Sequence, residues 1–295
     1  MKKLSKITLL GGDLRQAYAA DLLSGYFEQV ATWGMGKNTR EDASVIQYET
    51  LEGALAGCEF CVLPIKATRD GVTLDCPLDP SAKTGLLSIL DNISSNSTIL
   101  HGIVSNDTLS KANWQGIRCV NYYEREDLQI KNALLTAEGA IAEGITKTSF
   151  ALSGARVAVL GYGRIAKLLS EKLRLLGSDV TVFARKPADR ALAYASGVKS
   201  ASFDFSDRLA DDFDIIYNTV PARIIDSSIV SHMKKDVVFI DLATAPGGID
   251  FDLATSYDIT AVPAWGLPGK IAPKTAGEIV AQTIVQILTE EGYFT

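Results

Sequence analysis

Short apolar runs alternate with longer amphipathic segments along almost the whole chain. Apolar runs bounded by glycine, proline or polar clusters are typical of strands buried in a parallel sheet, and the segments between them have the period of a helix. We therefore predict an α/β fold with two Rossmann-like, doubly wound parallel-sheet domains in a dehydrogenase-like arrangement. The expected strands are residues 7–10, 30–33, 45–48, 60–65, 98–103 and 118–122 in the first half, and 157–160, 180–184, 215–219, 237–242 and 259–262 in the second.

Two long helical patterns divide the chain into domains. Residues 126–150 run without proline, and residues 275–290 follow the last expected strand. We expect the active site in the cleft between the two domains, at the carboxyl ends of both sheets. The expected division is an N-terminal substrate-binding and catalytic domain of residues 1–128 with a returning helix 275–295, a connecting helix 129–150, and a second domain of residues 151–274.

The expected strand at residues 157–160 runs directly into a glycine turn and an amphipathic helix. The turn reads Gly161-Tyr-Gly163-Arg-Ile-Ala166, the GxGxxA form of the dinucleotide-binding fingerprint. Gly161 permits the tight turn, Gly163 lets a pyrophosphate approach the backbone, and Ala166 lets the helix pack closely on the strand. The N–H groups at the helix N-terminus would hold the phosphates. The second domain is therefore predicted to bind a dinucleotide.

The end of the next strand helps to decide which dinucleotide is bound. An acidic residue there would bind the ribose hydroxyls of NAD, but this chain has Arg185 and Lys186. A guanidinium can bind a 2′-phosphate through two parallel charge-assisted hydrogen bonds, so we expect NADP, with NAD as the alternative if these residues only begin a solvated loop. Residues 218–221 should pass beside the nicotinamide ribose. The expected cofactor-binding residues are Gly161, Tyr162, Gly163, Arg164, Ile165, Arg185, Lys186, Asn218, Thr219, Val220 and Pro221.

Other segments that follow expected strands should also line the cleft. At residues 11–15 a glycine turn leads into a helix. Either Arg15 and the helix N–H groups bind a carboxylate, or Asp13 caps the helix and Arg15 is solvated. Asp241 ends an apolar strand before a Pro-Gly-Gly loop, and it either orients a substrate or caps that loop.

The C-terminal part and the middle of the chain add further candidates. Lys270 is a candidate for binding substrate charge, and the N–H groups near Thr275 could hold an anion. His101 follows an expected strand and could face the cleft, whereas we interpret His232 as structural. Residues 122–127 either contribute to the site or form the exposed, charged start of a helix.

Composition narrows the class of protein. The chain has 295 residues, of which 47% are hydrophobic, and its formal net charge is −6. No basic face or membrane-length apolar run is visible, which argues against nucleic acid and membrane partners, and the N-terminal apolar stretch predicts a strand rather than a signal peptide. Cys58 and Cys61 form a CxxC without a second pair, so we expect buried thiols and no metal. These features indicate a reduced, cytoplasmic protein.

Seven motifs are spread over the chain. The glycine fingerprint is generic to dehydrogenases, whereas the mid-chain helix and the last two motifs are much more specific. The motifs are GGDxR (residues 11–15), a YxRED-like segment (123–127), NAxxTAEGAI (132–141), GYGRIA (161–166), NTVPA (218–222), DLATAPGG (241–248) and GLPGKxAPKTAG (266–277).

In these motifs the chain resembles the family formed by the A subunit of dipicolinate synthase from spore-forming bacteria, over essentially its full length. The resemblance implies NADP-dependent oxidation of dihydrodipicolinate, formed from 4-hydroxy-tetrahydrodipicolinate, a lysine-pathway intermediate, to dipicolinate. It also implies that the partner is the flavoprotein-like B subunit of dipicolinate synthase, and it implies a role in sporulation and a location in the mother-cell cytosol. A homo-oligomer is compatible with it.

The implied substrate sets the chemistry that the site must perform. Dihydrodipicolinate is a cyclic dicarboxylate that becomes aromatic on losing a hydride, so the protein mainly needs to bind it, orient it and exclude water. Its two carboxylates need cationic and helix-end partners, and its ring proton needs a base. The candidates are Arg15, Arg125, Lys270 and Thr275 for substrate binding, and His101, Glu124 and Asp241 for catalysis.

Two other functions stay open at this point. A regulatory or partner subunit that binds NADP without turnover would have a cleft without cationic or acid–base groups. A 2-hydroxy acid dehydrogenase with the same two-domain plan needs an arginine and a His–Glu pair in the cofactor domain, and nothing near His232 matches that pair.

Overall fold

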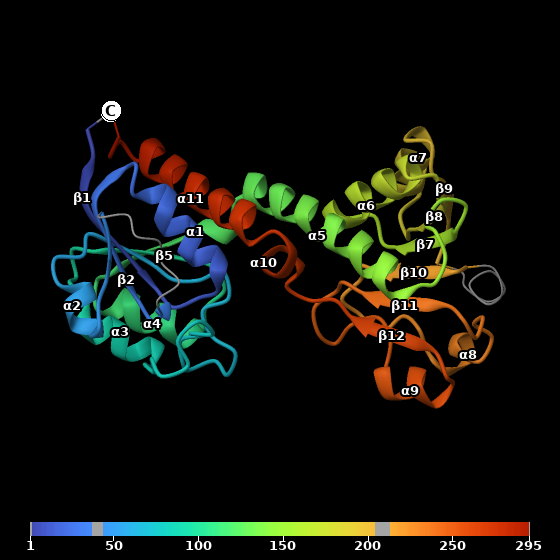
Figure 1. The fold of residues 1–295 in the computed structure, drawn as a ribbon, viewed down its shortest axis with the longest axis horizontal. Helices are drawn as coiled ribbons and strands as arrows, with labels where there is room; N and C mark the ends of the chain where they lie inside the picture. The colour runs from blue at the N-terminus through green and yellow to red at the C-terminus, as the bar shows by residue number, and fades with distance from the viewer. Residues whose placement is uncertain (1, 37–43, 204–212, 295) are drawn as a thin grey trace. The chain divides into compact units, whose positions relative to one another are not determined.

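The computed structural model describes residues 2–36, 44–203 and 213–294. The chain forms two compact units: a first unit of Met1–Lys131 with Ala272–Thr295, and a second unit of Asn132–Ile271. Each unit contains a parallel six-stranded sheet with helices on both faces (Figure 1), which confirms the predicted α/β fold with two Rossmann-like sheets.

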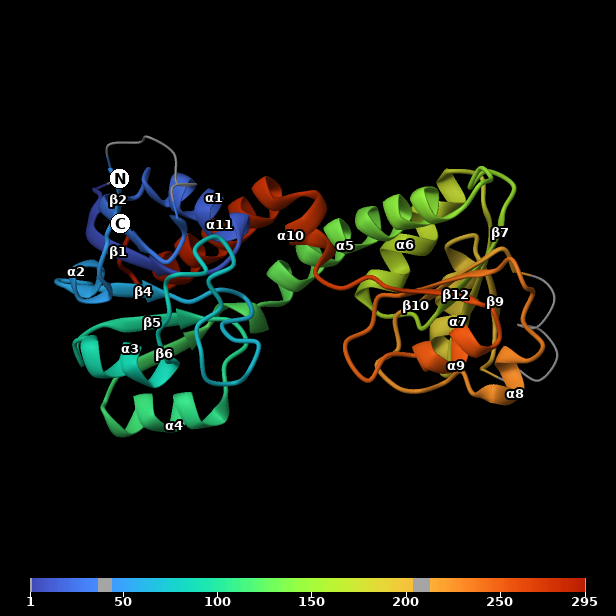
Figure 2. The same cartoon turned by 60° about the horizontal axis from the view of Figure 1, so that its bottom comes forward.

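The first unit has three layers, because helices cover both faces of its sheet. Its elements are β1 (Leu4–Leu10), α1 (Leu14–Leu23), β2 (Phe27–Trp33), β3 (Val45–Gln47), α2 (Leu51–Leu55), β4 (Phe60–Val62), α3 (Leu86–Asn92), β5 (Thr98–His101), α4 (Asn106–Trp114), β6 (Arg118–Asn121), a 3₁₀ turn (Tyr122–Glu124), the start of α5 (Glu126–Lys147), and α11 (Pro273–Glu290). Neighbouring residues of β1 point to opposite faces: Ile7 and Leu9 pack with α1 and α11, and Leu10 packs with α2, α3 and α4. Figure 2 shows α3 and α4 on the opposite side of the sheet from α11.

The C-terminal helix α11 completes the core of the first unit. Val280, Ile284 and Ile287 recur at helical spacing and are buried with residues of α1 and the sheet. Gly277 lies so close to α1 that an added Cβ would collide with the Arg15 carbonyl oxygen. The helix begins at Pro273, two residues before the expected start, because proline is well suited to the first helical position.

The second unit repeats this layered arrangement. Its elements are the remainder of α5, β7 (Arg156–Leu160), α6 (Arg164–Leu175), β8 (Asp179–Phe183), α7 (Pro187–Ala195), β9 (Lys199–Ala201), β10 (Ile215–Asn218), α8 (Ser227–Val230), β11 (Val238–Asp241), α9 (Phe251–Ser256), β12 (Thr260–Pro263) and α10 (Leu267–Ile271). Core residues from α5, α6, α7 and α10 pack on one face of the sheet, and residues from α8 and α9 pack on the other.

The two sheets have the same strand topology. The order is β3-β2-β1-β4-β5-β6 in the first unit and β12-β11-β10-β7-β8-β9 in the second, so the first strand of each unit lies beside its second and fourth strands. In such a sheet the order in which strands are added reverses between the first and fourth strands, which run parallel, and ligands bind outside the carboxyl ends of the strands at that point. Ligand sites are therefore expected at the carboxyl ends of β1 and β4 in the first unit, and of β7 and β10 in the second.

Two of the differences between the structure and the expected elements have a clear cause in the sequence. β4 ends at Val62 rather than at residue 65, because Pro64 has no N–H group to donate to a sheet. The short edge strand β9 was not expected, since its Lys-Ser-Ala sequence has no apolar run to bury.

A buried polar pair connects the ends of β10 and β11. Asn218 and Asp241 are paired in register, and both are fully buried. Asn218 Nδ2 donates to Asp241 Oδ1 at 2.8 Å, and the backbone N–H groups of Ala243 and Gly248 donate to the Asp241 carboxylate at 3.1 and 2.7 Å. A Cβ at Gly247 would lie 2.6 Å from Asp241 Oδ2, so the Pro-Gly-Gly loop needs glycine there. The carboxylate thus holds the loop after β11 in place.

Replacing Asp241 by asparagine should destabilise the second unit. Both carboxylate oxygens accept hydrogen bonds, so the new amide NH₂ must face a donor whichever way it turns. We expect a loss of about 1.5–3 kcal/mol in the free energy of unfolding, measured by urea denaturation followed by circular dichroism. The exposed Asp236 is the matched control, and Asp236→Asn should change the stability by less than about 0.5 kcal/mol. Equal stability of Asp241→Asn and the unchanged chain would contradict this role.

Candidate functional site

The glycine turn between β7 and α6 is held by contacts that only glycine permits. Gly161 has φ +97°, and a Cβ there would lie 2.5 Å from Thr219 Oγ1 and 3.2 Å from Val220 Cγ2. The Gly161 N–H donates to the Phe183 carbonyl at 2.9 Å, which ties the turn to the end of β8. The turn therefore fits tightly between the ends of β8 and β10.

The next glycine of the motif faces open space. Gly163 is the N-cap of α6, no side chain caps the first N–H groups of this helix, and a Cβ at Gly163 would meet no atom within 4 Å. Ala166 is fully buried between the helix and the sheet. Uncapped N–H groups beside open space form an anion site at the positive end of the helix dipole. These residues fit the pyrophosphate of a dinucleotide.

The other residues of the turn differ in how much of each side chain is accessible. Tyr162 is buried in the core of the second unit, so only its backbone is available to a ligand. Arg164 is exposed, and Ile165 packs against the same core. We expect the tyrosine ring to position the turn rather than to contact a cofactor.

The end of β10 forms the other wall of this opening. Thr219 Oγ1 donates to the Leu160 carbonyl at 2.7 Å, and the Asn218 amide bonds both Asp241 and the backbone of Val220. We expected Asn218 and Thr219 to offer hydrogen bonds to the cofactor, but these side chains are already occupied within the protein. Thr219 and Val220 are half-buried and Pro221 is exposed, so apolar side chains form much of the accessible wall.

The end of β8 carries basic residues, as the sequence indicated. Arg185 and Lys186 are exposed, and in the described part of the chain neither side chain forms an ion pair. Sequence reasoning missed Arg190, whose Nη1 donates to the carbonyl oxygens of Ala184 and Arg185 at 2.9 and 2.7 Å. A basic residue about one helical turn after Lys186 was the signal available in the sequence.

The corresponding turn of the first unit is filled by the protein itself. The Gly12 N–H donates to the Asp75 carbonyl at 2.7 Å, and a Cβ at Gly11 would lie 2.8 Å from the same oxygen. Asp75 belongs to the long connection between β4 and α3. This connection occupies the place where a pyrophosphate would approach the backbone, so the turn at Gly11 and Gly12 is closed.

Arg15 has an acidic partner two residues earlier in the chain. Its Nε and Nη2 donate to the two carboxylate oxygens of Asp13 at 2.9 and 2.8 Å, and Asp13 also caps α1. Burial acts to raise the pKa of Asp13, but the hydrogen bonds from Arg15 outweigh it and lower that pKa. Asp13 caps the helix, as one of the two sequence alternatives states, but Arg15 is paired rather than solvated, because the N-cap geometry turns the Asp13 carboxylate toward it. Arg15 therefore reaches a substrate only as part of this pair.

Arg125 is also paired. Its Nη1 and Nη2 donate to the two carboxylate oxygens of Glu290 at 2.5 and 2.9 Å, and its Nε lies 3.3 Å from Asp127. The hydrogen bonds from Arg125 lower the pKa of Glu290 to about 2. Arg125 thus joins the start of α5 to the end of α11 within the first unit.

His101 is buried at the carboxyl end of β5. Its Nδ1 donates to the Gly102 carbonyl at 2.8 Å, which leaves the Nε2 lone pair of the neutral ring available. Burial lowers the pKa of His101 below the ordinary value of 6.5, and the Gly102 carbonyl and the charge of Glu124 act in the opposite direction. The structure therefore brings two of the predicted catalytic residues, His101 and Glu124, within electrostatic range of each other.

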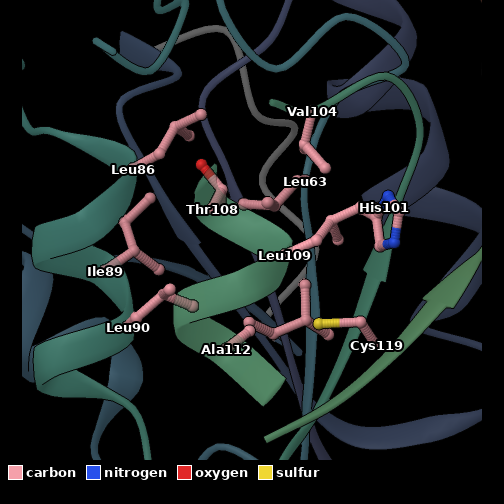
Figure 3. Close-up of a pocket in the computed structure, with 11 residues that line it drawn as sticks. Leu63, Leu86, Ile89, Leu90, His101, Val104, Thr108, Leu109, Ala112 and Cys119 are labelled. Carbon is pink, nitrogen blue, oxygen red and sulfur yellow. The ribbon is translucent and has the colours of Figure 1, made fainter. Parts of the chain in front are cut away.

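A small cavity of about 10 Å³ lies beside His101 (Figure 3). Leu86, Ile89 and Leu90 of α3 face Leu109 and Ala112 of α4 across it, with His101 at its side. Its volume is at most enough for one water molecule. This cavity is a packing gap of the core rather than a substrate site.

Several candidates follow neighbouring strands of the first unit. β1, β4, β5 and β6 are consecutive in the sheet. Arg15 follows β1, His101 ends β5, and Glu124 follows β6. Lys66, which follows β4, was missed from the sequence; it is exposed and has no ion pair in the described ranges. The carboxyl edge of this sheet therefore carries both cationic and acid–base groups.

Lys270 and Thr275 lie on either side of the boundary between the units. Lys270 is exposed in the last turn of α10, in the second unit, and Thr275 is exposed in the first turn of α11, in the first unit. No side chain caps the N-terminus of α11. Both residues are accessible, as their candidate roles require.

Two kinds of feature are absent from the part of the chain that the structure describes. It contains no group of three or more His, Cys, Asp or Glu side chains that could hold a metal ion. No helix in the described ranges has the length and apolar character needed to span a membrane. Cys58 and Cys61 are free and buried, as expected.

Comparisons with known proteins agree with this geometry. The model of the N-terminal domain of the dipicolinate synthase A subunit matches residues 6–123, and that of the D-isomer specific 2-hydroxyacid dehydrogenase NAD binding domain matches residues 126–250. The A subunit of dipicolinate synthase from Bacillus subtilis (strain 168) is 31% identical over 299 residues, covering 97% of this chain and 96% of the relative.

Solved structures show the same similarity. The crystal structure of the dipicolinate synthase A chain from Bacillus subtilis has a TM-score of 0.86 at 29% identity, covering 98% of this chain and 97% of that one. The A subunit from Bacillus halodurans has a TM-score of 0.87 at 29% identity, covering 97% and 99%. A transhydrogenase from Sinorhizobium meliloti shares the fold at 16% identity, with a TM-score of 0.73 and coverage of 96% and 94%.

The family matches and the open glycine turn lead to the same conclusion. The second unit is a nicotinamide-nucleotide-binding dehydrogenase domain, and the chain is an NAD(P)-dependent oxidoreductase. With a full-length relative at 31% identity and a matching N-terminal domain, the chain belongs to the family of dipicolinate synthase A subunits.

Proposed function

We propose that this chain oxidises dihydrodipicolinate to dipicolinate with NADP, in the cytosol of the sporulating mother cell and together with the B subunit of dipicolinate synthase. The observation that carries the proposal is the uncapped N-terminus of α6 beside the open Gly163, in a chain of the dipicolinate synthase A-subunit family. The relatives are named as one lettered subunit of a synthase, which supports a second subunit in the complex.

The residues of the second unit would bind the cofactor. The N–H groups at the start of α6 would hold the pyrophosphate, and Arg185 and Lys186 would meet the 2′-phosphate at the end of β8. Val220 and Pro221 would lie along the nicotinamide ribose. When bound, NADP accepts the hydride that the substrate ring gives up.

The residues of the first unit would bind the substrate and take up its proton. His101 is neutral near pH 7 because burial lowers its pKa, and Nε2 is the atom that would accept the ring proton. Glu124 would stabilise the imidazolium that forms. Arg15, Lys66 and Lys270 would hold the two carboxylates. Arg15 belongs to the first unit and Lys270 to the second.

The reaction itself is the test of this function. The purified chain, with and without the B subunit, would be given NADP and freshly made 4-hydroxy-tetrahydrodipicolinate, and the absorbance of reduced nicotinamide followed. We expect the absorbance of reduced nicotinamide to rise faster with NADP than with NAD. If no reduced cofactor forms in either mixture while NADP binds, the chain is a cofactor-binding regulatory protein instead.

Replacing Gly163 by valine should remove cofactor binding and leave the fold intact. The side chain would fill the open space at the start of α6, and Gly163 has φ −80°, which valine adopts without strain. We expect the Kd for NADPH to rise at least about 100-fold, which is about 2.8 kcal/mol, by calorimetric titration. Gly25→Val, at an exposed glycine of the first unit, should bind normally. Unchanged affinity of Gly163→Val would place the cofactor elsewhere.

The rate should depend on the protonation of His101. As the pH falls below 6.5 and through the lowered pKa of His101, the imidazole becomes charged and can no longer accept the ring proton, so kcat/KM should fall. His101→Asn should lower kcat roughly 10²- to 10⁴-fold and remove this acid limb of the pH profile. An unaltered acid limb in the variant would assign it to another group.

Arg15 and Lys270 should act on the substrate rather than on the cofactor. Arg15→Met and Lys270→Met keep most of the apolar stem and remove the charge. We expect each to raise KM about 10-fold or more and to lower kcat, with the Kd for NADPH unchanged. Lys147→Met, at an exposed lysine of α5, is the control. Wild-type kinetics in both variants would show that the dicarboxylate binds elsewhere.

A further inference from the structure

The guanidinium of Arg190 is fixed at the end of β8 by two backbone carbonyls. Arg190 lies in the first turns of α7, and its Nη1 donates to the Ala184 and Arg185 oxygens at 2.9 and 2.7 Å. These two bonds use both hydrogens of Nη1. The half-buried side chain is thereby held against the loop that carries Arg185 and Lys186.

The remaining donors of Arg190 have no partner in the described ranges. Neither Nε nor Nη2 forms a hydrogen bond there, and no carboxylate pairs with the guanidinium. Lys186 is the N-cap of α7, and no side chain caps the first N–H groups of that helix. Three cationic side chains and the uncapped N-terminus of α7 therefore lie close together in the chain, and Asp189 in the first turn of α7 forms no ion pair with any of them in the described ranges. Such an arrangement gains most from a dianion with several acceptor oxygens.

The location of this cluster indicates which dianion it binds. Leu160 and Phe183 are paired in register, and the Gly161 N–H donates to the Phe183 carbonyl. Ala184 and Arg185 consequently lie next to the turn that would hold the pyrophosphate. In this fold the residues at the end of the second strand meet the adenosine ribose.

We propose that Arg190 is a second ligand of the 2′-phosphate of NADP and, through its two carbonyl bonds, holds the loop that presents Arg185. The inference rests on the proposed function, because it assumes that the second unit binds NADP at the α6 turn. Nη1 fixes the loop, while Nε and Nη2 provide donors for phosphate oxygens.

A purely structural role for Arg190 makes a different prediction. If the guanidinium only held the two carbonyls, its removal would disturb the loop for every adenosine ligand alike. If it also binds the 2′-phosphate, ligands that carry this group lose more affinity than ligands that lack it. Comparing adenosine 2′,5′-bisphosphate with adenosine 5′-monophosphate separates the two roles without requiring turnover.

The experiment is a calorimetric titration of four proteins with these two ligands, NADPH and NADH. The proteins are the unchanged chain, Arg190→Met, Arg190→Lys and the control Arg174→Met, which alters an exposed arginine of α6. For Arg190→Met we expect the Kd for NADPH and the bisphosphate to rise about 10- to 100-fold, and the Kd for NADH and the monophosphate to change less than about 2-fold. Arg190→Lys keeps the charge, so its Kd for NADPH and the bisphosphate should lie between those of the unchanged chain and Arg190→Met. Arg174→Met should match the unchanged chain.

Several outcomes would overturn the inference. Equal losses for both adenosine ligands would make Arg190 a structural residue only, and unchanged binding would remove it from the site. If the unchanged chain binds the bisphosphate no better than the monophosphate, the 2′-phosphate site is wrong, while NADH binding would leave the oxidoreductase function standing. If it binds no dinucleotide, the proposed function itself fails. Should Arg190→Met not fold, the same comparison on Arg190→Lys decides.

Discussion

The two sheets are similar but differ at the turn after their first strand. In the first unit the Gly12 N–H of this turn donates a hydrogen bond of 2.7 Å to the Asp75 carbonyl. Both sheets have the same strand order, and both place a glycine turn after their first strand. In the first unit the connection between β4 and α3 lies against that turn. In the second unit the space beside Gly163 is open. One fold thus provides a closed turn in one unit and an open turn with an uncapped helix N-terminus in the other.

The open turn depends on polar groups that are satisfied inside the protein. Thr219 bonds the Leu160 carbonyl, and Asn218 and Asp241 bond each other and the surrounding backbone. These bonds fix the ends of β7, β10 and β11 without using any helix N–H group at the start of α6. Because buried polar groups without partners are costly, this network keeps the opening in one shape before a ligand arrives.

The sequence was sufficient for the features that depend on local patterns. The alternating strands and helices, and the glycine turn with its open second glycine, follow from apolar runs and from spacing within a few residues. The bond between Asp13 and Arg15 is also local, but the sequence does not show that the N-cap turns that carboxylate toward the arginine. The pairing of Arg125 with Glu290 joins residues far apart in the chain, and no local pattern indicates it. The contact of Asp75 with Gly12 likewise exists only once the long connection has folded back.

The number of dinucleotides bound per chain tests the central claim most directly, because it asks whether the two similar sheets differ as described. Calorimetric titration of the unchanged chain with NADPH should give one binding site per chain, since the turn of the first unit is closed by Asp75 and that of the second is open. Two sites per chain would show that the first unit also accepts a dinucleotide, and a stoichiometry of zero would show that the open turn does not bind one. Either result would contradict the account.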